Sequence, residues 1–212
     1  MNEILDEIYD DILAGNISGV KANVQAALDA GLAPGAILNE GMIAAMSEVG
    51  QLYESGDIYV AEMLISARSL QAGLAILKPH LRETNVKATG RVVIGTVRGD
   101  LHDIGKNLVA MMLEGAGFEI EDLGTDVSPQ RFVAAVQASH PDVVALSVLL
   151  TTTMPSMLTT IQALQAAGLR DQVKVIVGGA PVNEEYALEV GADGYAADAS
   201  QAVTLAKTLL AL

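Results

Sequence analysis

The stretch that decides the fold is Gly95-Thr-Val-Arg-Gly-Asp-Leu-His-Asp-Ile-Gly-Lys106. It begins within a short apolar, β-branched run, residues 91–97, of the kind found in buried strands. After it, apolar residues recur at helical spacing until Gly115. The pattern of strand, loop and helix places Asp100 and His102 just past the carboxyl end of a strand, which is where open α/β sheets bind ligands.

The spacing Asp-x-His-x-x-Gly in this loop, formed by Asp100, His102 and Gly105, suits a specific chemical use. A loop histidine can project outward as a ligand, while a carboxylate two residues earlier holds its other ring nitrogen. Glycine lets the backbone come close to something large. We therefore treat this loop as the candidate binding site.

Other charged and imidazole side chains carry no such pattern, and we expect them to be solvated or structural. His80 and His140 each adjoin a proline at an expected element boundary, so a structural role is favoured for both. On the sequence pattern alone, hydration of the loop or of the surface is also the expected role of Arg98, Asp103, Lys106, Glu119, Glu121, Asp122 and Asp126.

From residue 91 onward, strand and helix patterns alternate. Strands are expected at 91–97, 118–123, 143–148, 173–177 and around 194–195, and helices at 105–114, 129–138, 154–167, 183–190 and 200–210. Such βα units imply a parallel sheet covered on both faces. We predict an α/β domain over 90–212, flavodoxin-like (Rossmann-type), with five strands in the order 2-1-3-4-5 and a switch point between strands 1 and 3.

Residues 1–83 are predicted to form a separate helical domain. Apolar residues recur at helical spacing in four segments with short connections, which favours a four-helix bundle. Ser18 and Asp57 are expected to cap the second and fourth helices, and Pro34 to begin the third. Residues 84–90 are polar and without period, so they are predicted to be a linker.

Composition limits the partners and the compartment. The chain has 212 residues, no cysteine and a formal net charge of −14, so thiolate ligands are excluded, and nucleic acid and anionic membranes are poor partners. No uninterrupted apolar run reaches the roughly 18 residues of a membrane span. The acidic N-terminus argues against a signal or transit peptide. We expect a cytoplasmic protein whose partner is another protein or a small neutral or cationic ligand.

Two further loops should meet the His102 loop at the same edge of the sheet. Strand 3 is followed by Ser147-Val-Leu-Leu-Thr-Thr-Thr153, which is rich in hydroxyls, and strand 4 by Gly178-Gly-Ala-Pro-Val182, where glycines allow close backbone approach. A turn beginning at Tyr195 is expected on the same rim. This set suits a long ligand with a polar tail threaded between strands, and no phosphate-binding glycine motif is present.

At these residues the sequence resembles the cobalamin-binding corrinoid proteins, over nearly the whole chain. The three parts of their signature occur in order, each at a strand exit: Asp100-Leu-His-Asp-Ile-Gly105, Ser147-Val-Leu149 and Gly178-Gly179. With the helical module in front, the chain is similar to the small corrinoid methyl carriers of methyltransferase systems, which are themselves similar to the cobalamin module of methionine synthase.

The resemblance implies a cofactor and a site. Cobalamin would bind base-off with its dimethylbenzimidazole tail between strands 1 and 3, and His102 would be the lower axial cobalt ligand. Asp100 would hydrogen-bond the His102 ring, and Thr153, where methionine synthase-like modules have Ser, would complete the relay. The helical domain would cap the upper face near Met46, Tyr59, Glu62 and Met63. The predicted cofactor-binding residues are Asp100, His102, Asp103, Ile104, Gly105, Ser147, Leu149, Thr151, Thr153, Gly178, Gly179, Tyr195 and Met63.

The function implied by the resemblance is carriage of a methyl group on cobalt, alternating between methylcobalamin and cob(I)alamin, with no catalytic residue of the chain's own. One partner would be a substrate-specific methyltransferase using methanol, a methylamine, an aryl methyl ether or a betaine. A second would pass the methyl group to tetrahydrofolate or a thiol, and a corrinoid reductive activase would be a third. Two alternatives stay open. An adenosylcobalamin-dependent isomerase subunit normally lacks the helical module, and a cobalamin-sensing regulator needs a basic recognition helix, whereas residues 1–80 are acidic.

Overall fold

The computed structural model describes residues 3–83 and 88–212, and of residues 82–83 only the backbone. The chain divides into two compact units, a helical unit of residues 1–89 with 114–117 and an α/β unit of residues 90–113 with 118–212. Most of the predicted linker, residues 84–87, lies outside the described residues. Each unit is described by itself.

The α/β unit is built on a five-stranded parallel sheet in the order β2-β1-β3-β4-β5. The flavodoxin-like order predicted from the alternating pattern is therefore confirmed. The strand bounds are Arg91–Thr96 (β1), Glu119–Asp122 (β2), Val143–Ser147 (β3), Lys174–Gly178 (β4) and Gly194–Ala196 (β5). The apolar residues of the central strands β1, β3 and β4 are buried, as expected for a parallel sheet covered on both faces.

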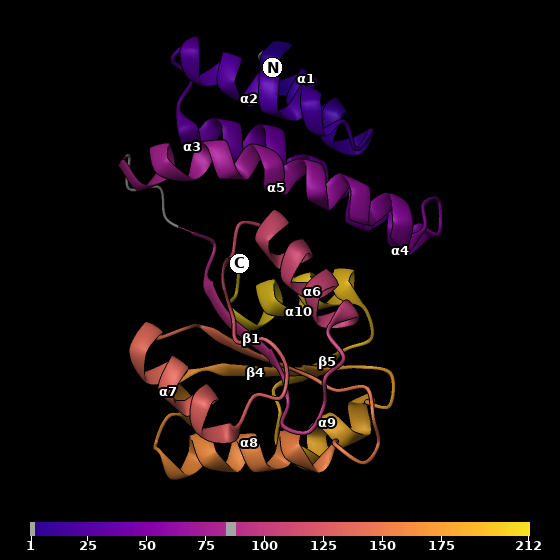
Figure 1. Cartoon of the computed structure of the whole chain (residues 1–212), viewed down its shortest axis with the longest axis vertical. Coiled ribbons are helices and arrows are strands. Elements are labelled where there is room, and N and C mark those ends of the chain that lie inside the picture. Colours follow the sequence, from indigo (N-terminus) through magenta and orange to yellow (C-terminus); the bar gives the residue numbers. More distant parts are fainter. Residues whose placement is uncertain (1–2, 84–87) are drawn as a thin grey trace. The chain divides into compact units, whose positions relative to one another are not determined.

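Helices cover both faces of the sheet (Figure 1), with α6 and α10 on one side and α7, α8 and α9 on the other. The helix bounds are Ile104–Gly115 (α6), Pro129–Ser139 (α7), Pro155–Ala166 (α8), Glu184–Val190 (α9) and Ala199–Leu209 (α10), with a short 3-10 turn at Arg170–Gln172. Phe132 and Met157 are fully buried on the α7–α9 side. Gly95 in β1 makes room there, since a Cβ at this position would lie 2.8 Å from the Phe132 ring.

The helical unit contains the four predicted helical segments. They are Glu3–Leu13 (α1), Ile17–Asp29 (α2), a continuous third segment formed by Pro34–Ala36 (α3), a π-helix at Ile37–Ile43 (η1) and Ala44–Ser55 (α4), and Val60–Glu83 (α5). Both predicted caps are wrong. Asn16 rather than Ser18 caps α2, through its side-chain oxygen and the Gly19 amide, because the chain becomes helical at Ile17. Asp57 lies before the start of α5, where the Tyr59 amide instead bonds the Glu62 carboxylate.

A hydrogen bond from the Tyr9 phenol to the Glu48 carboxylate joins α1 to α4. This bond, together with partial burial and the nearby Glu48 and Asp10 charges, raises the pKa of Tyr9 to about 12. Around it the bundle interior is aliphatic and rich in Met, since the chain has few aromatic residues. The buried side chains include Ile8, Ile12, Val24, Met42, Val49, Leu70 and Leu77.

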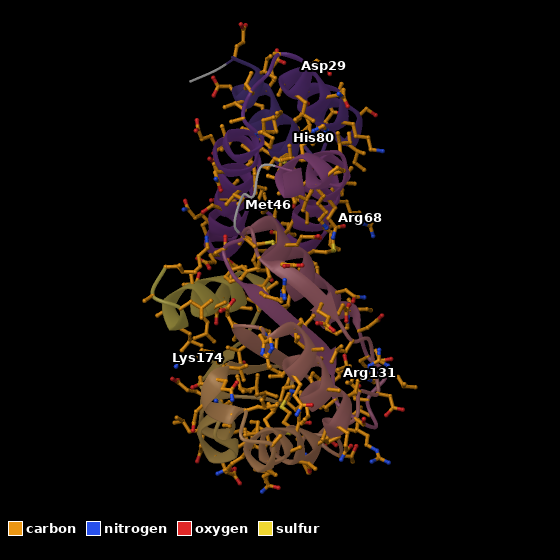
Figure 2. The ribbon with its side chains drawn as sticks, turned by 90° about the vertical axis from the view of Figure 1, so that its left-hand side faces the viewer. Asp29, Met46, Arg68, His80, Arg131 and Lys174 are labelled. Atoms are coloured by element: carbon orange, nitrogen blue, oxygen red, sulfur yellow. The ribbon has the colours of Figure 1, made fainter. Side chains whose placement is uncertain are left out.

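By length and composition alone, one helix among the described residues could cross a membrane, the stretch Val60–Leu81 of α5. A core helix of a bundle passes the same test, and α5 buries a continuous stripe of Met63, Ala67, Leu70, Leu74 and Leu77. We therefore regard α5 as a bundle helix. Charged side chains such as those of Asp29, Arg131 and Lys174 lie at the surface (Figure 2).

Candidate functional site

Asp100 is the centre of the site. It follows β1, its carboxylate is completely buried, and it accepts hydrogen bonds from five donors. Oδ1 receives the amide (3.0 Å) and ring Nδ1 (2.7 Å) of His102, and Oδ2 receives the amides of Leu149 (2.8 Å) and Leu150 (3.1 Å) and the hydroxyl of Thr153 (2.9 Å). One carboxylate thus ties the loop after β1 to the loop after β3.

The hydrogen bonds decide the charge of this carboxyl. Burial by itself raises the pKa of Asp100, but the bonds from the Leu149 amide, from the amide and ring of His102 and from the Leu150 amide outweigh burial and hold that pKa well below its usual range. Asp100 is therefore a carboxylate, which can only accept hydrogen bonds.

The orientation of His102 follows from that charge. Because Asp100 accepts, Nδ1 of the ring carries the hydrogen that it donates, and Nε2 is the nitrogen left with a lone pair in the neutral ring. The His102 side chain is 50% exposed, so Nε2 can be reached by a ligand from outside the unit. This arrangement of carboxylate, imidazole and open nitrogen is typical of a metal-ligating histidine with its supporting acid.

Thr153 lies where the relay implied by the resemblance requires a hydroxyl. Its Oγ1 is 2.9 Å from Asp100 Oδ2 and also 2.9 Å from the Leu150 carbonyl. A hydroxyl has one hydrogen, so it donates to one of these acceptors at a time. Thr151, two residues earlier, is exposed.

The glycine pair after β4 meets the end of β3. Ser147 and Gly178 are register partners, and Gly179 has a φ of +128°, a conformation open to glycine. A Cβ at Gly179 would lie 1.8 Å from the Val148 carbonyl oxygen, so no larger residue fits without moving the backbone. Tyr195, on β5, is half-buried and pairs with Val177.

Exposed apolar side chains lie on the two loops that are joined at Asp100. Leu101 and Ile104 from the His102 loop are 72% and 78% exposed, and Leu149 and Leu150 from the loop after β3 are 43% and 41% exposed. Asp103 and Gly105 are also exposed, and a Cβ at Gly105 would meet nothing within 4 Å. Exposed aliphatic side chains on the same loops as an open ring nitrogen offer a surface for a large, partly apolar ligand.

The structure thus brings together Asp100, His102, Leu149 and Thr153 through hydrogen bonds, and Ser147 with Gly178 through strand pairing. Met63 lies on α5 of the helical unit and is buried. Its predicted contact with the cofactor remains a prediction, as do the contacts of Thr151 and Tyr195.

Several residues that hold the loop were missed. Thr96, buried at the end of β1, donates its hydroxyl to the His102 carbonyl (2.8 Å), and Ser156 donates to the Arg98 carbonyl (3.0 Å). Asp126 accepts from the Gly99 amide (2.7 Å) and donates its own amide to the Asp100 carbonyl (2.9 Å). The position of Asp126 shortly after β2, at the same edge of the sheet, was the one available signal.

The expectation for Lys106 is wrong. Rather than hydrating the loop, this side chain is 2% exposed and pairs with Asp122 and with the Asn107 side chain (2.6 Å). Asp122 also accepts from the Gly124 amide (2.8 Å), so this acidic residue links α6 to the end of β2. A buried ammonium needs such partners, and the sequence pattern did not reveal them.

Comparison with known proteins places the chain in a class. A family model described as B12 binding domain matches residues 90–204, and a second model with the same description matches residues 4–78. Both units therefore correspond to cobalamin-binding proteins, with the α/β unit carrying the Asp100–His102 loop.

Relatives of known sequence identify a narrower group within the cobalamin-binding proteins. Over 209 residues the chain is 41% identical to dimethylamine corrinoid protein 2 of Methanosarcina acetivorans, covering 98% of this chain and 96% of that protein. It is 39% identical over 204 residues to trimethylamine corrinoid protein 1 of the same organism, covering 95% and 92%. The chain belongs to the corrinoid protein family, and its cofactor is cobalamin.

Similar solved structures also come from cobalamin-dependent proteins. The methanol:cobalamin methyltransferase complex MtaBC from Methanosarcina barkeri matches with a TM-score of 0.89 at 29% identity, over 99% of this chain and 80% of that one. A cobalamin-binding protein from Desulfitobacterium hafniense DCB-2 matches with a TM-score of 0.79 at 33% identity, over 97% and 98%.

The residues present fit this cofactor. Cobalt accepts an imidazole nitrogen. The site offers one open nitrogen on a ring held by a buried carboxylate, and the loops that carry these groups also expose aliphatic side chains. Gly179 lets the loop after β4 pack directly against the Val148 backbone at the end of β3, where a Cβ would not fit.

Proposed function

We propose that this chain carries a methyl group between a substrate-specific methyltransferase and a second, acceptor-specific methyltransferase. When bound, cobalamin supplies a cobalt centre that can take up and release a methyl group. The main observation behind this proposal is the Asp100–His102 pair. A fully buried carboxylate holds Nδ1 of a half-exposed imidazole and leaves Nε2 open. The relatives named as corrinoid proteins and the match to a methyltransferase complex support it.

The residues of the chain would divide the work as follows. His102 would hold the cobalt through Nε2, and Asp100 would keep the ring oriented. Thr153 would support Asp100 from the opposite side. Leu101, Ile104 and Leu149 would offer apolar contacts to the bound cofactor and keep water from His102. Ser147, Thr151, Gly178 and Gly179 would line the place for its nucleotide tail. Tyr195 and Met63 would complete the contacts.

The partners and the compartment are also part of this proposal. We propose a methyltransferase as the donor-side partner, a tetrahydrofolate- or thiol-specific methyltransferase as the acceptor side, and a reductive activase that restores the reduced cofactor, all in the cytoplasm. Methylamines are the first donors to test, because the relatives with about 40% identity are named for dimethylamine and trimethylamine. Methanol, aryl methyl ethers and betaines form the comparison set.

The test of the site uses purified protein reconstituted with hydroxocobalamin and desalted. The wild-type protein should remain coloured. After reduction to the cobalt(II) form, its electron paramagnetic resonance spectrum should show splitting by one axial nitrogen, and that splitting should change when the protein is grown with 15N-histidine. The isotope separates a protein imidazole from the cofactor's own base.

His102→Ala should keep part of the cobalamin and lose the isotope-sensitive splitting. His140→Ala, at the end of α7, is the matched control and should behave as wild type. The proposed role of His102 would be refuted if the wild-type protein were colourless after desalting. It would also be refuted if His102→Ala left the electron paramagnetic resonance spectrum unchanged.

A further inference from the structure

Thr96 is the last residue of β1, and its side chain is completely buried. Its backbone is already committed to the neighbouring loop, because its amide donates to the Gly124 carbonyl (2.9 Å) and its carbonyl accepts from the Val127 amide (3.0 Å). The hydroxyl is the remaining polar group, and it donates to the carbonyl oxygen of His102 at 2.8 Å. A buried hydroxyl is costly without a partner, so this bond is a defined part of the site.

Three hydrogen bonds therefore fix His102. Asp100 holds its amide at 3.0 Å and its ring Nδ1 at 2.7 Å, and Thr96 holds its carbonyl at 2.8 Å. The side chain is half-exposed, so packing restrains it less than it restrains a core residue. Asp100 alone fixes the amide and the ring but leaves the peptide group after His102 free to turn. The Thr96 hydroxyl fixes that peptide, and with it the Cα from which the ring extends.

We propose that Thr96 is a positioning residue that holds the His102 imidazole, through its carbonyl, where Nε2 can bind cobalt. The inference rests on the proposed function. Thr96 acts through His102 and needs no contact with the cofactor. Pre-organisation of this kind matters because a ligand held in one orientation loses less freedom when it binds its metal.

The test compares two substitutions at this position in the reconstituted full-length protein. Thr96→Val removes the hydroxyl and keeps the shape of the side chain, whereas Thr96→Ser keeps the hydroxyl and removes a methyl group. The readout is the fraction of cobalt(II) protein that shows the 15N-histidine-sensitive splitting. We expect Thr96→Val to lower the ratio of histidine-bound to histidine-free cobalt about fivefold, the factor that one net hydrogen bond makes in an equilibrium. Thr96→Ser should stay within about twofold of wild type.

Thr160 provides a matched control in the same unit. It is also completely buried, and its hydroxyl also donates to a backbone carbonyl at 2.8 Å, that of Ser156 within α8. Thr160→Val should leave the histidine-bound fraction unchanged. A purely structural effect of losing a buried threonine hydroxyl would appear equally in Thr160→Val and Thr96→Val, and that result would overturn the inference.

The remaining outcomes also decide it. A wild-type fraction in Thr96→Val, or an equal loss in Thr96→Ser, overturns the positioning role while the proposed function stands on the His102→Ala comparison. If the wild-type protein itself lacks the histidine signal, the proposed function fails and the inference with it. If Thr96→Val does not fold, as judged by circular dichroism and an unfolding midpoint, Thr96→Ala replaces it. The histidine-bound fraction of Thr96→Ala is then compared with that of Thr96→Ser.

Discussion

The hydroxyl of Thr153 lies 2.9 Å from Oδ2 of Asp100, although 53 residues separate the two in the chain. Together with the amides of Leu149 and Leu150, this hydroxyl holds one side of a carboxylate whose other side holds His102. The loops after β1 and β3 are thus joined through a single buried charge, and the orientation of the imidazole depends on a residue from the far loop.

Asp100→Asn should destabilise the cofactor-free protein at pH 7 by about 3 kcal/mol, because an amide nitrogen would face donors that now meet a carboxylate. The folded pKa of Asp100 is lowered, so the unfolded chain takes up the proton first. The stability from this group is complete above the unfolded pKa of about 3.9 and is lost as the pH falls below it. The free energy of unfolding of both proteins should be measured in urea from pH 7 to pH 3.

We expect the difference in free energy of unfolding between wild type and Asp100→Asn to shrink as the pH falls. A difference that is constant with pH would show that Asp100 does not owe its stabilising effect to its charge. Asp171→Asn, at an exposed position of a short 3-10 turn, is the control and should change little at any pH.

Gly179→Ala should destabilise the α/β unit by more than 2 kcal/mol, on the order of other severe backbone conflicts. The added Cβ would lie 1.8 Å from the Val148 carbonyl oxygen, in a backbone conformation that L residues rarely adopt. Gly168→Ala is the matched control, because Gly168 also has a positive φ but nothing within 4 Å of the added Cβ, and it should cost about 1 kcal/mol. Equal unfolding midpoints for the two variants would contradict the close approach.

The two partners of the Lys106–Asp122 pair should differ in how much their removal costs, because only Lys106 is buried. Asp122→Ala should cost about 3 kcal/mol in unfolding free energy, because it leaves a 2% exposed ammonium without its carboxylate. Lys106→Met should cost less than about 1 kcal/mol, because the Asp122 side chain is 39% exposed and water can solvate its carboxylate once the ammonium is gone.

The double variant Lys106→Met with Asp122→Ala should then be more stable than Asp122→Ala alone. Urea unfolding of the four proteins gives the coupling directly. If the double variant were the least stable of the four, the buried charge would not be the cause.

Asp126 combines a left-handed backbone, with a φ of +52°, with a side chain that accepts from the Gly99 amide. Asp126→Asn should stay within about 0.5 kcal/mol of wild type, since asparagine keeps an acceptor oxygen and tolerates this conformation. Asp126→Ala should lose about 2 kcal/mol, from the missing acceptor and from backbone strain together. The stability of Asp126→Gly should fall between those of the other two variants, because glycine loses the acceptor but relieves the backbone strain. Thermal unfolding of the three variants gives the order, and an order other than Asn, Gly, Ala would contradict this account.

Much of the fold could be predicted because it depends on local pattern. Apolar, β-branched runs alternating with helical spacing are enough to specify parallel βα units, and the chain then has few permitted strand orders. The pair Asp100 and His102 could be found for the same reason, since two residues in one loop contact each other through the short path of that loop.

The caps and the supporting residues could not be predicted in this way. Ser18 and Asn16 are both good caps, and the point where the chain enters the helix decides between them. From the sequence, Lys106 is expected to be a solvated loop residue. Its partner Asp122 lies at the end of β2, and only the folded sheet places the two side by side.

By itself, the sequence determined the order of the elements, the carboxyl-edge position of the Asp-x-His loop and the family. Tertiary structure decided that Asp100 is a buried carboxylate and that Thr96, Asp126 and Thr153 hold the loop around it. The physical reason is that hydrogen bonds between segments far apart in the chain depend on where the sheet places those segments, and no local periodicity encodes that placement.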